Sequence, residues 1–193
     1  MKETVRNTII LTVITLISGL LLGVVYQLTK EPIARGQEET RQEAFRTVMP
    51  EGNEFEELEV EEDYSFNDGQ EEVSGAVLAR DSGGQDIGYC INVTTHEGYG
   101  GDIDICVGIL PDGSIKGVEI LSISETAGLG MRANTPEFKA QFVQKGPEAI
   151  AYSKTGASLD NEIDALSGAT ITSNAMTNAV NAALDYWQEV IGK

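Results

Sequence analysis

The hydrophobic residues of this chain follow three patterns in turn. An uncharged, mostly apolar run covers positions 7–29, hydrophobic residues alternate with others between positions 73 and 123, and they recur at helical spacing over 174–191. These patterns predict, in order, a membrane-spanning helix, a set of β-strands and an α-helix. We therefore expect an α+β protein in which a single N-terminal transmembrane helix precedes a domain with an antiparallel sheet flanked by helices.

The apolar run has the length of a membrane anchor. At about 1.5 Å per residue it spans roughly 34 Å, enough to cross a bilayer with some tilt. It is too long for the apolar part of a signal peptide, and no clear small-x-small cleavage site follows it. Basic residues flank both ends equally, so the orientation rests on the short N-terminal tail. We expect residues 1–6 in the cytoplasm, residues 7–29 in a bacterial inner membrane and the large domain on the extracytoplasmic side.

Residues 30–72 are expected to form a helical and acidic connecting segment. Pro32 and Gly36 are expected to interrupt the helix, and a second helix is predicted over 37–49. Seven of the ten residues at 54–63 are carboxylates. They lack the spaced ligands of a calcium loop, so a solvated surface segment is predicted.

The alternating region predicts an antiparallel meander. Strands are expected at 73–79, 87–93, 103–109 and 115–123, with a tight turn at Pro111-Asp112-Gly113. A short helix is expected at 136–144, before the C-terminal helix. Cys90 and Cys106 both fall on the face opposite the Ile/Val stripe, where a disulfide and two free thiols both remain open.

Composition excludes several functions. The chain has 13 basic and 31 acidic residues, a formal charge of −18, and nucleic-acid binding needs the opposite balance. Two cysteines without a C-x-x-C pair and a single histidine give no metal site. The sequence also shows no nucleophile–base pair, so no catalytic residue is assigned.

Three small-residue loops carry the candidate chemistry. Positions 164–172 read D-A-L-S-G-A-T-I-T and lead into the C-terminal helix, where free backbone N–H groups and the helix dipole favour a phosphate. An ordinary Ser/Thr helix cap is the alternative. The other two loops are G-Y-G-G at 98–101 and E-T-A-G-L-G at 125–130. Glycines there allow something to approach the backbone closely.

These loops resemble the motifs of the FMN-binding domain family. Asp164, Ser167, Gly168, Ala169 and Thr170 match the flavinylation pattern D-x-x-[ST]-G-A-T, in which a flavin transferase attaches FMN to the last threonine through a phosphoester. The 125–130 loop resembles the family's E-T-P-G-L-G, with Ala127 in place of proline, and the 98–101 loop resembles its glycine-rich loop. The resemblance implies an FMN-binding domain over 73–193.

The same resemblance implies which residues serve the cofactor. Thr170 is implied as the FMN attachment site, and Asp164 as a residue that the flavin transferase recognises. The other cofactor-binding positions that it implies are Ser167, Gly168, Ala169, Ile171, Thr172, Glu125, Thr126, Gly128, Leu129 and Gly130. For Glu125 and Thr126, a plain loop-capping role is the alternative. His96 and Tyr99 are expected to have only a loop role.

With its anchor, the whole chain is most similar to G subunits of the Rnf ion-translocating electron-transport complexes. The resemblance implies an electron carrier in a complex that oxidises reduced ferredoxin, reduces NAD and moves Na⁺ or H⁺. Its implied partners are the other membrane and peripheral subunits, the flavin transferase and the membrane. Two alternatives stay open: the C subunit of a sodium-translocating NADH:quinone oxidoreductase, and a non-redox anchored binding domain.

Overall fold

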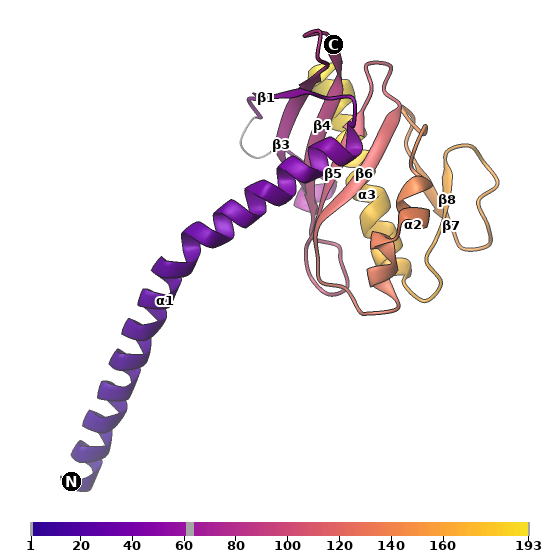
Figure 1. The fold of residues 1–193 in the computed structure, drawn as a ribbon. Coiled ribbons are helices and arrows are strands. Elements are labelled where there is room, and N and C mark those ends of the chain that lie inside the picture. Colours follow the sequence, from indigo (N-terminus) through magenta and orange to yellow (C-terminus); the bar gives the residue numbers. More distant parts are fainter. Residues whose placement is uncertain (1, 61–63, 193) are drawn as a thin grey trace. The chain divides into compact units, whose positions relative to one another are not determined.

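The N-terminal part of the chain is one long helix. The computed structural model describes residues 2–60 and 64–192 (Figure 1). Helix α1 covers Lys2–Val48, and it is long and apolar enough to cross a membrane. The chain divides into two compact units, Met1–Thr40 and Arg41–Lys193. The last turns of α1 therefore belong to the same unit as the sheet.

The expected interruption of the helix at Pro32 and Gly36 is wrong. Both residues lie inside α1. A proline removes one backbone N–H donor and crowds the carbonyl four residues before it, and a glycine costs about 1 kcal/mol relative to alanine. The residues around them, such as Ala34, Gln37 and Glu38, are strong helix formers, so the helix continues through both positions.

The sheet is the antiparallel meander that the alternation predicts. Its strands lie in the order β1-β3-β4-β5-β6, and β2 also pairs with β3. Two of the strands fall within the segment 30–72, which was expected only as a connection. Residues 61–63 of the acidic run lie outside the described residues. The strands are β1 (Glu54–Leu58), β2 (Ser65–Phe66), β3 (Glu71–Arg80), β4 (Asp86–Thr95), β5 (Ile103–Ile109) and β6 (Ile115–Ile123); a short 3₁₀ turn, η1 (Asn67–Gly69), links β2 to β3.

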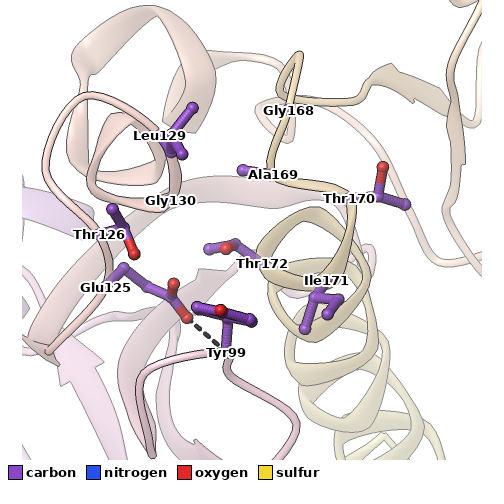
Figure 2. Close-up of a pocket in the computed structure, with 10 residues that line it drawn as sticks. All are labelled: Tyr99, Glu125, Thr126, Leu129, Gly130, Gly168, Ala169, Thr170, Ile171 and Thr172. Atoms are coloured by element: carbon purple, nitrogen blue, oxygen red, sulfur yellow. Dashed lines mark hydrogen bonds between the residues drawn. The ribbon is translucent and has the colours of Figure 1, made fainter.

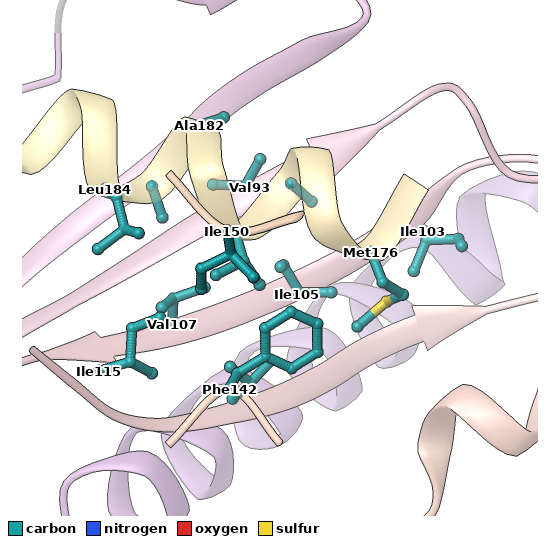
Figure 3. Close-up of a cluster of buried hydrophobic side chains, with 14 of the residues drawn as sticks. Val93, Ile103, Ile105, Val107, Ile115, Phe142, Ile150, Met176, Ala182 and Leu184 are labelled. Atoms are coloured by element: carbon teal, nitrogen blue, oxygen red, sulfur yellow. The ribbon is translucent and has the colours of Figure 1, made fainter. Parts of the chain in front are cut away.

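Each face of the sheet is covered by a helix. Helix α3 (Thr170–Tyr186) packs on the Ile/Val face, where Val93, Ile105 and Val107 are fully buried (Figure 3). The end of α1 covers the other face through Ala44, Phe45 and Val48, which pack with Cys90 and Cys106. The two cysteines are buried free thiols. Burial raises the pKa of the Cys106 thiol, and the neighbouring Cys90 raises it further.

The segment between the sheet and α3 differs in two places from the expected helices. Helix α2 ends at Ala140 rather than at 144. Residues 141–143 donate their backbone N–H groups to carbonyls three residues back, and Gln144, with φ +66, donates its N–H to Ile115 of β6. Helix α3 begins at Thr170, one turn before the expected position, and ends in a π-helical turn. The remaining elements are η2 (Gly130–Asn134), α2 (Pro136–Ala140), the parallel pair β7 (Ala151–Ser153) and β8 (Glu162–Asp164), and η3 (Trp187–Ile191).

Glycines in the sheet let the end of α1 sit directly on the strands. Gly108 and Gly117 are paired across β5 and β6, and Val48 lies over both. A Cβ atom at Gly108 would be 2.9 Å from the Val48 carbonyl oxygen and 3.0 Å from its Cβ. The close fit buries the apolar end of α1, which places Phe45 in the same core as the two thiols.

We expect the substitution Gly108→Ala to destabilise the domain by about 1–3 kcal/mol, because the added methyl group has no space beneath Val48. The free energy of unfolding is measured by urea denaturation of the full chain in detergent, with Trp187, the only tryptophan, as the fluorescent probe. Gly75→Ala, in β3 of the same unit, is the control, because a Cβ there would make only an ordinary contact, at 3.5 Å from the Asn92 side chain. Equal stability of the two variants would contradict this packing.

Candidate functional site

Three loops that are distant in the sequence enclose one cavity of about 550 Å³. This volume is within the range of about 300–1,000 Å³ that is usual for ligand sites. The walls come from the loop after β4, the loop after β6 and the first turn of α3 (Figure 2). The lining residues are Tyr99, Glu125, Thr126, Leu129, Gly130, Gly168, Ala169, Thr170, Ile171 and Thr172.

The helix that opens at this cavity has no side-chain cap. Ala169 occupies the N-cap position of α3, and alanine has no acceptor to offer. The expected alternative of an ordinary Ser/Thr cap is therefore wrong. The first backbone N–H groups of a helix have no partner inside it and carry the positive end of the helix dipole. An anion in the cavity would find these donors available.

The hydroxyl groups around the turn differ in their surroundings. Ser173 is buried, donates its hydroxyl proton to the Ala169 carbonyl and accepts the Leu166 N–H. Thr172 is only 1% exposed. Thr170 is half-buried and lines the cavity. Ser167 is exposed and is not among the lining residues.

Glu125 joins two of the cavity walls. One carboxylate oxygen accepts the backbone N–H of Tyr99 at 2.7 Å and that of Gly100 at 3.3 Å (Figure 2). The structure thus gives Glu125 the loop-capping role that the sequence left as an alternative. Its other oxygen is the reason for a glycine at 130: a Cβ there would be 2.5 Å from it and 2.6 Å from the Thr172 hydroxyl.

The mouth of the cavity carries apolar side chains. Tyr99 is 70% exposed, Ile171 52% and Leu129 43%. Sequence reasoning placed Leu129 and Ile171 at the site but gave Tyr99 only a loop role. An aromatic residue inside a glycine-rich loop was the available signal. A flat aromatic ring that carries a phosphate fits these walls, because they combine apolar surface with an uncapped helix start.

Besides Ser167, two other predicted residues do not line the cavity. Gly128 has φ +76 and forms the turn that carries Leu129. Asp164 is exposed at the end of β8, where its carboxylate accepts the Ala157 N–H at 2.5 Å. Its backbone N–H donates to the Gln141 side chain. Asp164 is thus placed on the surface, close in sequence to the turn but not in its wall.

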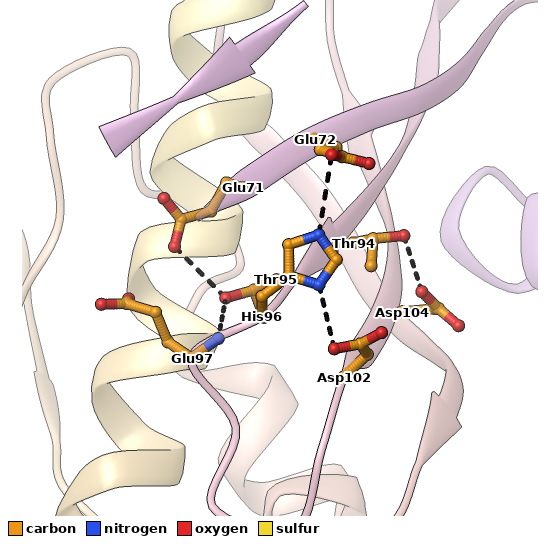
Figure 4. Close-up of polar contacts among 8 residues, drawn as sticks. All are labelled: Glu71, Glu72, Thr94, Thr95, His96, Glu97, Asp102 and Asp104. Carbon is orange, nitrogen blue, oxygen red and sulfur yellow. Dashed lines mark hydrogen bonds and ion pairs between the residues drawn. The ribbon is translucent and has the colours of Figure 1, made fainter. Parts of the chain in front are cut away.

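His96 closes the base of the loop that carries Tyr99. Its Nδ1 lies 2.9 Å from the Asp102 carboxylate and its Nε2 lies 3.7 Å from Glu72 (Figure 4). The hydrogen bond to Asp102 raises the pKa of His96, with a smaller contribution from Glu72, although partial burial opposes the rise. Protonated His96 therefore joins the two ends of the 97–101 loop.

We expect His96 to stabilise the fold only in acid. Because the folded-state pKa lies above the ordinary value of 6.5, the stabilisation is complete below that pH and is lost as the pH rises through the folded-state pKa. For a partly exposed pair it amounts to about 0.2–1 kcal/mol. Urea denaturation of wild type and His96→Asn over a pH series measures it. A difference that persists unchanged in alkali would contradict the ion pairs.

Comparison with known proteins places the chain in a family. The family model for the FMN-binding domain matches residues 98–185, and that for the RnfG N-terminal region matches residues 1–48. The G subunit of the proton-translocating ferredoxin:NAD(+) oxidoreductase complex of Clostridium ljungdahlii is 30% identical over 91% of this chain and 86% of its own length. The G subunit of the Na(+)-translocating complex of Acetobacterium woodii is 30% identical over 98% and 94%.

The crystal structure of NqrC from Shewanella oneidensis has the same fold, with a TM-score of 0.55 over 81% of this chain and 94% of that chain. Its sequence identity is 17%, so the likeness concerns the fold alone. The matches to the two G subunits cover 91% and 98% of the chain, and the RnfG N-terminal region covers the apolar helix. The chain therefore belongs to the family of G subunits of ion-translocating oxidoreductase complexes and carries an FMN-binding domain.

Proposed function

We propose that this chain is the membrane-anchored electron-transfer subunit of an Rnf-type ferredoxin:NAD⁺ oxidoreductase complex, and that it carries FMN bound covalently to Thr170 through a phosphoester. One observation carries the proposal: Thr170 lines the cavity at the start of a helix that has no side-chain cap. The family's FMN-binding domain covers this turn.

Thr170 is favoured over its neighbours by access. Ser173 is buried and already hydrogen-bonded, Thr172 is almost fully buried, and Ser167 is outside the cavity wall. A phosphoester at Thr170 leaves the phosphate beside the free N–H groups of the first turn, where negative charge is stabilised by about 0.3–1 kcal/mol. A flavin transferase would form this bond, with Asp164 as a recognition residue on the nearby surface.

The remaining wall residues would hold and shield the flavin. When bound, FMN supplies the redox chemistry, and the protein sets its position and surroundings. Tyr99, Leu129 and Ile171 offer apolar surface for the ring, and the glycine at 130 keeps the wall open. The cavity faces solvent, so one edge of a bound ring is accessible to a redox partner. Ferredoxin and NAD⁺ would bind other subunits of the complex.

The relatives indicate the type of complex but not which ion it transports. One relative is named for proton translocation and the other for Na⁺ translocation, and this chain is equally identical to both. The assignment to the C subunit of a sodium-translocating NADH:quinone oxidoreductase has only the shared fold in its support. We place the domain on the extracytoplasmic side of the membrane, because the apolar run is placed like a signal anchor, next to the N-terminus; the basic residues at its two ends are equal in number and do not decide the orientation.

We expect co-expression with a flavin transferase to yield a chain that fluoresces under ultraviolet light on a denaturing gel. Thr170→Ala should remove the fluorescence completely, because no other hydroxyl of this helix start both lines the cavity and is accessible. Thr155→Ala, which removes an exposed hydroxyl outside the flavinylation pattern, is the matched control and should keep it. Mass spectrometry of the peptide that contains residue 170 locates the added FMN.

Fluorescence that persists in Thr170→Ala would contradict the attachment site. A wild-type chain without fluorescence after co-expression would favour the non-redox binding domain.

A fusion of a reporter enzyme that is active only outside the cytoplasm tests the orientation. With the reporter after residue 193 we expect full activity, and with the reporter before residue 1 we expect none. The reverse pattern would place the FMN-binding domain in the cytoplasm.

A further inference from the structure

A fully buried carboxylate lies beneath one wall of the cavity. Glu71, the first residue of β3, is 0% exposed. One of its oxygens accepts the Asn67 side-chain amide at 2.7 Å, and the other accepts the Thr95 hydroxyl at 3.2 Å. The Glu97 carboxyl is its neighbour, and the interaction between the two groups raises the pKa of Glu71. Both side chains that donate these hydrogen bonds, Asn67 and Thr95, are neutral.

Glu97 in turn reaches across to α3. One of its carboxylate oxygens accepts the side-chain amides of Asn174 at 3.2 Å and Asn178 at 2.5 Å, both of them neutral donors. Figure 4 shows Glu71 and Glu97 on the side of α3, whereas His96 points away from the helix toward Glu72 and Asp102. Among the described contacts, no Lys, Arg or His side chain faces the pair.

Two neighbouring carboxylates, one of them fully buried and the other half-buried, are costly to ionise together when no cation lies beside them. Burial is the main cause that raises the pKa of Glu71; the hydrogen bond from Asn67 lowers it, the contact with Glu97 raises it further, and Thr95 lowers it slightly. The net direction is upward. Glu71 therefore binds a proton more readily than an ordinary glutamate does, and the Glu97 carboxylate is the acceptor beside that proton.

This pair connects two walls of the cavity. Glu97 directly precedes the 98–101 loop, in which Tyr99 lines the cavity, and its amide partners lie one and two turns after Thr170 on α3. Thr95 links the two glutamates, since its hydroxyl donates to the Glu71 carboxylate and accepts the Glu97 backbone N–H. Repulsion between the two carboxylates would push Glu97, and the loop that follows it, away from α3.

We infer that Glu71 and Glu97 share one proton and act as a positioning pair: with the proton, they hold the 98–101 loop against α3, and its loss to solvent releases this wall of the cavity. The inference rests on the proposed function only for the identity of the cavity's occupant. With FMN in place, the pair makes the position of Tyr99, and the charge beside the ring, depend on pH.

The sign of the effect follows from the direction of the pKa change. The pKa of Glu71 is higher in the folded chain than the ordinary value of 4.5, so its stabilisation is complete below that pH and is lost as the pH rises through the folded-state value. Each unit of difference in pKa corresponds to about a tenfold change in the equilibrium that closes the loop.

The test is hydrogen exchange at the backbone amides of residues 97–101 in the full chain in detergent, without attached flavin. In wild type, after correction for intrinsic exchange, we expect protection to fall by about tenfold or more between about pH 5 and pH 9. In Glu71→Gln the amide still donates to Glu97 but no proton can be lost, so protection should stay constant apart from the contribution of His96, which both proteins share.

Two further variants complete the experiment. Glu97→Gln removes the second charge and should also flatten the profile, which keeps the test valid if Glu71→Gln does not fold. Glu54→Gln, an exposed carboxylate on β1, is the matched control and should behave as wild type. A wild-type profile without pH dependence, or a Glu71→Gln profile that falls as in wild type, would overturn the inference.

These outcomes are independent of flavin attachment. A pH-dependent loop in a chain that never gains fluorescence would refute the covalent FMN and leave the positioning pair standing. A fluorescent chain with a loop insensitive to pH would refute the positioning pair and leave the covalent FMN standing.

Discussion

The uncapped start of α3 is the constraint on which the arrangement of this domain depends. Backbone N–H groups at a helix start need partners, and Ala169 supplies none. The turn is nevertheless fixed, because Ser173 ties the Leu166 N–H to the Ala169 carbonyl from inside the core. The buried serine hydroxyl thus holds the turn and leaves the N–H groups facing the cavity. A site for an anion results without a basic side chain among the lining residues.

This solution suits a strongly acidic domain. With a formal charge of −18, basic side chains are scarce, and the cavity walls are held by carboxylates that accept neutral donors instead. Glu125 accepts backbone N–H groups of the 98–101 loop, and Glu97 accepts amides of α3. The same loop is thus tied at two points to the two other walls. Such bonds to charged acceptors are worth about 1.5–3 kcal/mol each, so they can fix a glycine-rich loop that has few apolar contacts.

The sequence predicted those features that repeat or that are local. Alternation located strands β3 to β6 to within a few residues, and the small-residue loops located three walls of one cavity. It did not predict that α1 continues through Pro32, or that α2 stops at Ala140. Whether a helix continues at such a point depends on the other hydrogen-bond partners and packing that the fold offers to its backbone. Gln144 leaves its helix for a partner on β6, and no local propensity encodes that partner. Glu71 and Glu97 are far apart in the sequence, so their contact could not be inferred from spacing either.

The position of Thr170 relative to the cap fits the proposed attachment of FMN to this residue. A capping hydroxyl accepts the N–H groups of its own helix, and its replacement costs about 1 kcal/mol. Thr170 is the first helical residue rather than the cap, so a substituent on its oxygen removes no hydrogen bond that the helix start needs. The glycine before the cap, Gly168, has φ +78 and turns the chain sharply there, which leaves the first turn open to the cavity. A phosphate attached at Thr170 would therefore complete the helix start, acting as the cap that the sequence omits.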